Sequence, residues 1–237
     1  MSCAVVFGAS GGVGGALVAQ LAASGRYGQV YAAARRPLPP QAGVVAAPCD
    51  VTDEDSIAAL AASLAAPPTL VVVASGLLHD AALGIAPEKT LRQIDPVAMA
   101  RLYAVNTIGP ALVGKHLLPR LPRDQRAVFA VLSARVGSIG DNRLGGWHSY
   151  RAAKAALNMV VANFAIEMRR THPQAVVVAL HPGTVATALS APFRGAVPPA
   201  RLMSPDQAAR HLLRVADGLA PQDSGGLFAW DGERLPW

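Results

Sequence analysis

The sequence is poor in aromatic residues, in charge and in lysine. Phe, Trp and Tyr make up 5% of its 237 residues, so alanine, valine and leucine must form most of the hydrophobic core. Charged residues reach only 15%, against 52% hydrophobic ones. This balance excludes an intrinsically disordered chain, which needs low hydrophobicity and high charge.

Cysteine is also scarce, and long apolar runs are missing. Cys3 and Cys49 are too few for a disulfide framework or a metal cluster, and we interpret both as small buried residues. No run approaches the roughly 20 apolar residues of a membrane-spanning helix. The apolar run at 4–7 stops at Gly8, and no basic residue precedes Arg26, so a signal peptide is not expected. We expect a cytoplasmic protein with no metal and no membrane partner.

The formal net charge of +6 raises the question of nucleic-acid binding. Such binding needs basic residues clustered on one face or along one helix. The arginines here are scattered, and the densest pairs are Arg35-Arg36 and Arg169-Arg170. We therefore expect no nucleic-acid partner, and we expect a local arginine pair to bind a small anion.

Short apolar runs alternate with longer helical patterns along the chain. Strands are expected at residues 4–7, 29–33, 44–47, 70–74, 127–132, 175–180 and 227–230. Helices are expected at 12–24, 53–64, 96–118, 150–170 and 205–218. The alternation predicts a Rossmann-type α/β fold, a doubly wound seven-stranded parallel sheet with helices on both faces. These elements use the whole of residues 1–237, which favours a single domain.

A glycine-rich segment joins the first expected strand to the first expected helix. It reads Gly8-Ala9-Ser10-Gly11-Gly12-Val13-Gly14-Gly15. Glycines let the backbone approach a pyrophosphate closely, and the free N–H groups at the start of a helix bind the anion. Because the segment lies between a strand and a helix, it predicts a dinucleotide site. A simple tight turn is the alternative.

The second expected strand ends in Ala34-Arg35-Arg36, without an acidic residue. An acid there would bind the ribose hydroxyls of NAD, whereas arginine pairs with the 2′-phosphate of NADP. NADP(H) is therefore favoured over NAD(H), with solvated loop arginines as the alternative. Asp50 follows the third strand, where it can meet the adenine or cap the next helix, a role that Thr52 fills equally well.

Tyr150 and Lys154 are spaced four residues apart at the start of an expected helix. Residues with this spacing share one helix face. A nearby ammonium would lower the pKa of the tyrosine from its ordinary value near 10, as a general acid or base requires. Such a pair on a helix surface is common, so its meaning depends on the residues that accompany it.

Further candidates follow the expected strands. Ser133 ends the fifth strand, and Pro182-Gly183-Thr184 follows the sixth, at the carboxyl ends where such sheets bind ligands. In chain order, the motifs that carry a family likeness are Gly8, Gly12 and Gly14, Asp50, Asn106, Tyr150 with Lys154, and Pro182-Gly183. With these the chain resembles the short-chain dehydrogenase/reductase family, in its single-domain branch. Residues 137–147 and Trp230-Asp231-Gly232 are similar to the subgroup of bacterial C-factor-like proteins and sniffer-type carbonyl reductases.

The resemblance implies a reduction of an aldehyde or ketone to an alcohol with NADPH. Tyr150 would exchange a proton with the substrate oxygen, Lys154 would assist it, and Asn106 would fix a relay water. A serine would bind the substrate carbonyl, and Thr187 the carboxamide of the cofactor. The implied cofactor contacts are Gly8, Ser10, Gly12, Val13, Gly14, Arg35, Asp50, Val51, Gly76, Tyr150, Lys154, Pro182, Gly183 and Thr187. A homodimer or homotetramer through the long helices is also implied.

Two departures from the family pattern leave alternatives open. Residues 73–76 read Val-Ala-Ser-Gly, without the family's asparagines. The family's serine lies three residues before a glycine, and counting back from Gly137 reaches Ala134, one residue after Ser133. A shift of one residue along a strand points a side chain to the other face. We predict Ser133 as the substrate-binding serine, with Ser138 or no serine as alternatives.

The same departures keep other functions open. A catalytically weak dinucleotide-binding sensor on this scaffold is the main alternative, and a nucleotide-dependent methyltransferase is a weaker one. Residues 188–203 form a long irregular stretch with few polar groups. They predict a lid over an apolar substrate, with a surface loop as the alternative. Trp147, just before the Tyr150 helix, is expected to line the substrate pocket.

Overall fold

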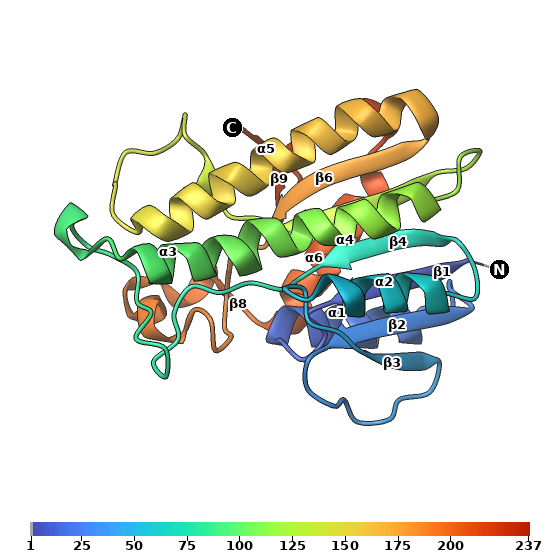
Figure 1. Ribbon diagram of the computed structural model, residues 1–237, viewed down its shortest axis with the longest axis horizontal. Coiled ribbons are helices and arrows are strands. Elements are labelled where there is room, and N and C mark those ends of the chain that lie inside the picture. Colours follow the sequence, from blue (N-terminus) through green and yellow to red (C-terminus); the bar gives the residue numbers. More distant parts are fainter. Residues whose placement is uncertain (1) are drawn as a thin grey trace.

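The computed structural model describes residues 2–237. One eight-stranded sheet runs through its middle in the order β10-β9-β6-β5-β4-β1-β2-β3, with helices on both faces (Figure 1). The parallel strands are β1 (Cys3–Phe7), β2 (Gln29–Ala34), β3 (Val44–Pro48), β4 (Pro68–Val73), β5 (Ala127–Leu132), β6 (Ala175–His181) and β9 (Leu227–Ala229). The predicted doubly wound sheet of seven parallel strands is therefore confirmed.

The sheet has one strand more than the sequence predicts. The strand β10 (Arg234–Leu235) turns back at Gly232 and pairs antiparallel with β9, which makes eight strands rather than seven. A two-residue strand is too short to show a period in the sequence. A separate pair, β7 (Thr184–Val185) and β8 (Leu202–Met203), joins the two ends of the predicted lid segment.

The helices are close to their predicted positions, with one division. They are α1 (Gly12–Ala23), α2 (Glu54–Ser63), α3 (Pro96–Tyr103), α4 (Gly109–Leu117), α5 (His148–Thr171) and α6 (Pro205–Gly218). The region expected as one helix over 96–118 contains a π-helical turn at Ala104–Ile108 between α3 and α4. Pro110 has no N–H to donate back into the helix, and the Gly109 N–H donates to Ala104 O, five residues back. Asp53, not Thr52, caps α2.

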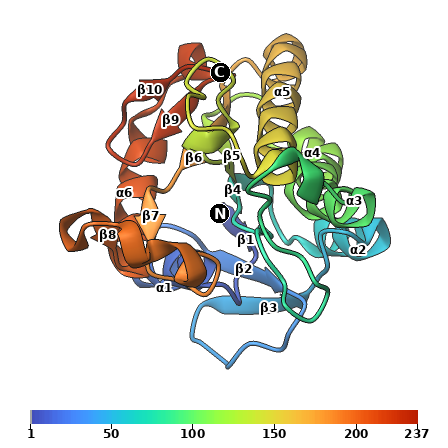
Figure 2. The same cartoon turned by 90° about the vertical axis from the view of Figure 1, so that its left-hand side faces the viewer.

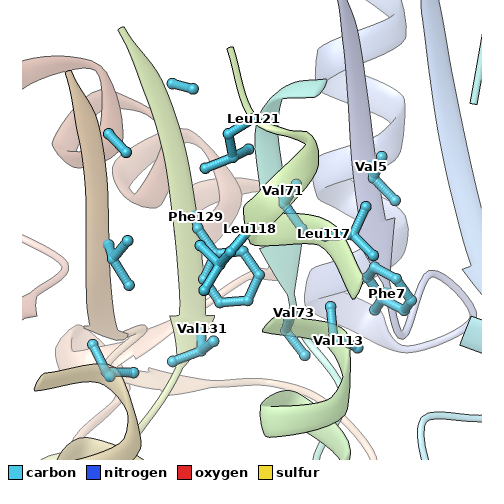
Figure 3. Packing of buried hydrophobic residues seen from close by; sticks show 14 of the residues in the cluster. Val5, Phe7, Val71, Val73, Val113, Leu117, Leu118, Leu121, Phe129 and Val131 are labelled. Atoms are coloured by element: carbon cyan, nitrogen blue, oxygen red, sulfur yellow. The ribbon is translucent and has the colours of Figure 1, made fainter. Parts of the chain in front are cut away.

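Side chains from alternate strand positions form two cores. On one face, Val5, Phe7, Val71 and Phe129 pack against the helices α2, α4 and α5 (Figure 3). On the other face, the neighbouring strand residues pack against α1 and α6, and Figure 2 shows these two sets of helices on opposite sides of the sheet. Strands buried on both faces must be apolar throughout, which explains the valine-rich sequence of β4.

Because the central strands are parallel, their carboxyl ends lie along one edge of the sheet. The segments that follow β1, β2, β4, β5 and β6 therefore gather there. These segments carry most of the predicted site residues. Within residues 2–237, no helix combines the length and the apolar character needed to cross a membrane.

Candidate active site

The glycine loop after β1 is a tight turn against the end of β2. Gly8 has a φ of +79°, and the N–H groups of Gly8 and Ala9 both donate to Ala33 O, at 2.9 and 3.0 Å. A Cβ at Gly14 would overlap Gly8 O. The N-cap of α1 is Gly11, with no capping side chain and no acid in the first turn. The first N–H groups of α1 are thus open to an anion, as a pyrophosphate site requires.

The segment after β6 reaches this loop. A Cβ at Gly12 would lie 2.7 Å from Thr187 Cγ2, so the predicted cofactor contacts Gly12 and Thr187 lie side by side. Gly183 has a φ of +74°, and a side chain there would collide with Met203 and Trp230. Glycines at positions 12 and 183 therefore let the segment after β6 pack closely against the loop and against Met203 and Trp230.

Arg35 and Asp50 lie on the side of the loop that leads to β3. Arg35 is exposed at the end of β2. Asp50 Oδ1 accepts hydrogen bonds from the Thr52 N–H at 2.9 Å and Oγ1 at 2.8 Å. Burial acts to raise the pKa of Asp50, but these bonds and the nearby Arg35 and Arg101 lower it below its ordinary value. The charge of Arg35 thus reaches Asp50, and the role of both residues in binding the adenosine end of a cofactor stays a prediction.

Asn106 is fully buried in the π-helical turn, where it holds the segment that follows β4. Its Nδ2 donates to Leu77 O at 2.7 Å and Leu102 O at 3.0 Å, and its Oδ1 accepts from the Leu77 N–H at 3.1 Å. Gly76 lies against it, because a Cβ there would be 3.5 Å from Asn106 Oδ1. The side chain is thus committed to backbone groups, and its role in a water relay stays a prediction.

Tyr150 and Lys154 lie on the buried face of α5, only 7% and 3% exposed. Lys154 Nζ donates to Leu132 O at 2.8 Å and lies 5.8 Å from the centre of the Tyr150 ring. Between them, Ala153 O accepts from Thr107 Oγ1 at 2.7 Å, which ties α5 to the π-helical turn. The predicted pair is therefore buried at the sheet edge and not on a helix surface.

Burial sets the ionisation of both groups. It raises the pKa of the Tyr150 phenol above its ordinary value and lowers the pKa of Lys154 to about 7. The direction for Tyr150 is opposite to the one expected from a neighbouring ammonium, because loss of water outweighs any attraction between the two groups. Buried groups with displaced pKa values at a sheet edge are typical of functional sites.

The structure places the serines differently from the prediction. Ser133 Oγ donates to Asn158 Oδ1 at 2.7 Å, two helical turns from Tyr150 along α5. Ala134, the next residue, packs instead in the hydrophobic cluster that contains Tyr150. Ser138 is buried, and its Oγ accepts from the Asp141 N–H at 3.1 Å. The alternation that keeps Val131 facing α5 also turns Ser133 that way, so of residues 133 and 134 it is the alanine that joins the cluster around Tyr150.

The rings of Trp147, Phe193 and His79 pack one against the next beside Tyr150, and Trp147 among them is a predicted pocket residue. The Trp147 ring lies 6.3 Å from Tyr150 and 5.1 Å from Phe193, both edge to face. Phe193 also meets His79 at 5.7 Å, and His79 Nε2 is 3.2 Å from Ala188 O. Phe193 belongs to a 3₁₀ turn at Ala191–Ala196 in the predicted lid. The only sequence signal for it was a lone aromatic residue in that segment.

Comparison with known proteins decides the family. The model of the short chain dehydrogenase family matches residues 2–197. The chain belongs to this family. Among its relatives, the C-signal protein of Myxococcus xanthus is 38% identical over 148 residues, which are 62% of this chain and 83% of that protein. The 1-hydroxy-2-glutathionyl-2-methyl-3-butene dehydrogenase of Rhodococcus sp. (strain AD45) is 36% identical over 200 residues, 83% of this chain and 82% of the relative.

Solved structures of short-chain dehydrogenases share the whole architecture. An NADPH-bound carbonyl reductase from chicken fatty liver superposes with a TM-score of 0.84 at 27% identity. The superposition covers 100% of this chain and 94% of the reductase chain. The carbonyl reductase Sniffer of D. melanogaster gives a TM-score of 0.85 at 19% identity over 100% of both chains, a likeness of fold. The predicted resemblance to this family, and to its C-factor-like members, is confirmed, and the chain shares the fold of the sniffer-type reductases.

The lowered pKa of the buried Lys154 predicts that the stability of the protein depends on pH. Its pKa is about 7 in the folded chain, while an unfolded lysine holds its proton to about pH 10. Above pH 7 the unfolded chain therefore binds more protons, and the free energy of unfolding rises with pH by up to about 1.4 kcal/mol per unit. Lys154→Met lacks the titrating group, so its free energy of unfolding lacks this rise. In denaturant titrations, the free energy of unfolding of the variant minus that of the wild type should therefore fall steadily from about pH 7 to about pH 9.5.

Lys89→Met is the matched control, because Lys89 is an exposed lysine of the same chain. Its stability should follow the wild-type pH dependence. A Lys154→Met variant that keeps that dependence would show that Lys154 retains an ordinary pKa in the folded protein.

Proposed function

We propose that the protein is an NADPH-dependent carbonyl reductase that converts an aldehyde or ketone to an alcohol, and reversibly oxidises the alcohol. The observation that carries this proposal is the buried Tyr150–Lys154 pair beside a glycine loop with open N–H groups. Membership of the short chain dehydrogenase family supports it. The NADPH-bound carbonyl reductase of similar fold and the Rhodococcus dehydrogenase support it further.

The residues present fit a nicotinamide dinucleotide. The turn at Gly8, Gly12 and Gly14 and the start of α1 would hold the pyrophosphate, and Arg35 the 2′-phosphate. Thr187, beside Gly12, would hold the carboxamide end. When bound, the cofactor supplies a hydride from nicotinamide C4. The preference for NADP(H) over NAD(H) rests on Arg35 and on the lack of an acid at the end of β2.

Tyr150 then donates a proton to the substrate oxygen. Burial raises the pKa of its phenol, so Tyr150 is protonated at neutral pH, as a proton donor in the reductive direction must be. Lys154, whose pKa burial lowers to about 7, gains or loses its own proton near neutral pH. It can therefore return a proton to the tyrosine after each turnover.

The surroundings of Tyr150 favour an apolar substrate. The cluster that contains the tyrosine is formed by apolar side chains from five parts of the chain: Leu77, Leu78, Ile85, Ala98, Leu102, Ala134, Val136, Trp147 and Phe193. The Phe193 ring on Trp147 brings the lid segment to this cluster. Desolvating an apolar substrate against such walls costs little, whereas a charged one would lose its hydration without a partner.

A dinucleotide-binding sensor with little turnover is the second candidate. It is favoured by Ala134, which leaves no hydroxyl at the position of the family serine, and by the similarity to the C-signal protein. Tight NADPH binding in calorimetry without turnover on any carbonyl would establish it. In either case we propose a cytoplasmic homodimer or homotetramer through the long helices, where Val97, Ile108, Met159 and Ile166 are exposed.

Replacement of the tyrosine tests the proposed function. The wild type should consume NADPH in the presence of members of a panel of apolar aldehydes and ketones. Tyr150→Phe keeps the ring and removes the proton donor, so kcat should fall by about 10²- to 10⁴-fold, while the Kd for NADPH stays within about twofold. Tyr27→Phe, at the opposite edge of the sheet, is the control. Full activity in Tyr150→Phe would refute the mechanism.

Replacement of Arg35 tests the cofactor preference. Loss of a charge-assisted bond to the 2′-phosphate should raise the Kd for NADPH about 10- to 100-fold in Arg35→Ala. NADH has no such phosphate, so its Kd should change little. Fluorescence titration with both cofactors measures the two values, with Arg214→Ala, at an exposed arginine of α6, as the control. Equal losses for NADPH and NADH would contradict the role of Arg35.

A serine at position 134 tests what the site lacks. Because Ala134 packs beside Tyr150, the hydroxyl in Ala134→Ser would lie where it can bind the substrate oxygen. One such hydrogen bond to a developing charge can raise kcat by about tenfold or more, and steady-state kinetics on the best carbonyl substrate would show it. If Ser133 is instead the binding group, Ser133→Ala abolishes turnover and Ala134→Ser gains nothing.

A further inference from the structure

Glu88 is a buried carboxyl group outside the site described so far. It lies in the segment between β4 and α3 and is only 4% exposed. Acidic side chains are almost never buried to this extent without specific partners. Its partners all belong to the start of α5, some sixty residues further along the chain.

The carboxyl group and the backbone of Glu88 both bind this helix end. Oε1 and Oε2 each accept from the Ser149 N–H at 3.3 Å, and Ser149 Oγ donates to Oε1. Glu88 O accepts from the Trp147 N–H at 2.6 Å. Glu88 therefore binds both the last residue before α5 and the second residue within the helix.

Helix α5 needs such a partner because it has no cap of its own. Its N-cap is Trp147, which makes no capping bond and has a left-handed φ of +50°. The first turn contains no acidic residue. The first N–H groups of a helix lack partners within the helix, and a carboxylate there also meets the positive end of the helix dipole. Glu88 supplies from a distant segment what Asp53 supplies to α2 locally.

Tyr150 lies in the turn that Glu88 holds, whereas Lys154 is held by other groups. Lys154 Nζ is bound to Leu132 O, and the peptide before Lys154 is bound to Thr107 Oγ1. If the first turn of α5 loosens, Tyr150 and Trp147 move while Lys154 stays. The relative position of the phenol and the ammonium therefore depends on Glu88.

We propose that Glu88 is a positioning residue, which fixes the first turn of α5 and through it the phenol of Tyr150. The order of the helix end follows from the geometry alone. The consequence for turnover rests on the proposed carbonyl reductase function. The two parts are tested by different measurements, so that the failure of one does not hide the other.

Hydrogen exchange tests the helix end without any assay of activity. In Glu88→Ala, the hydrogen-bonded amides of Trp147, Ser149 and Arg151 should exchange at least about tenfold faster than in the wild type, as expected for local opening, while those after Lys154 keep their protection. Glu88→Gln keeps an acceptor oxygen and should lie between the two. Glu167→Ala, at an exposed glutamate on the same helix, is the control and should match the wild type.

Kinetics test the consequence for Tyr150. In Glu88→Ala, kcat should fall by about tenfold or more, as for other small misplacements of a reacting group, with the Kd for NADPH within about twofold. Glu88→Gln should recover part of kcat. Ser149→Ala, which removes only the Oγ donor, should give a smaller loss in the same direction, and serves where Glu88→Ala does not fold.

The possible results distinguish failure of the proposal about Glu88 from failure of the proposed function. Unchanged exchange at the amides of Trp147, Ser149 and Arg151 in both Glu88 variants would overturn the proposal, whatever the activity. Faster exchange with an unchanged kcat would overturn the positioning of Tyr150. If the wild type reduces no carbonyl, the proposed function fails and the exchange result alone decides whether Glu88 holds the helix end. A kcat and an NADPH affinity that fall together in Glu88→Ala would indicate general damage to the fold and also count against it.

Discussion

The hydrogen bond from Lys154 Nζ to Leu132 O is the interaction on which the site depends. Burying an ammonium is costly unless it finds a partner, and the partner here is a backbone carbonyl at the end of β5. The bond fixes how closely α5 approaches the strand. A Cβ at Gly137 would lie 2.7 Å from Lys154 Cβ, so the turn after β5 needs a glycine for this contact. The position of Tyr150, one helical turn earlier, then follows.

Burial explains why the two ionisable groups differ from free side chains. Lys154 Nζ is bound to a backbone carbonyl oxygen, and loss of water raises the pKa of Tyr150 and lowers that of Lys154. A lysine near half ionisation and a protonated tyrosine suit proton donation at neutral pH. Apart from Asn158, the other buried positions of α5 are apolar or small, so their packing helps to offset the cost of burying these two groups. The buried tyrosine and lysine thus lower the stability of the fold at the place where the reaction needs a proton donor.

The sequence predicts much of this fold because the local patterns of apolar residues, prolines and glycines agree with the overall α/β architecture. The apolar run at 127–132 and the Pro205 start of α6 match the observed elements, and the four-residue spacing of Tyr150 and Lys154 identifies the pair. It does not predict the antiparallel β10 or the π-helical turn, since two residues show no period and the turn depends on Pro110 within a packed helix. Nor does it show that the Ser133 hydroxyl, just after β5, donates to Asn158, because that partner comes from a distant helix; the role of Ser133 toward a substrate stays a prediction.

Glu88 shows a more general reason for what sequence reasoning misses. A cap that lies within three residues of its helix, such as Ser204 with Gln207 at α6, is visible as a local pattern. A cap supplied from a distant irregular segment has no such pattern, because its partner is chosen by the tertiary fold alone. The same segment also contributes Leu78 and Ile85 to the cluster around Tyr150. The stretch between β4 and α3 is therefore both a wall of the candidate substrate site and the support of the helix that carries its proton donor, so changes in this segment affect substrate fit and the placement of the tyrosine together.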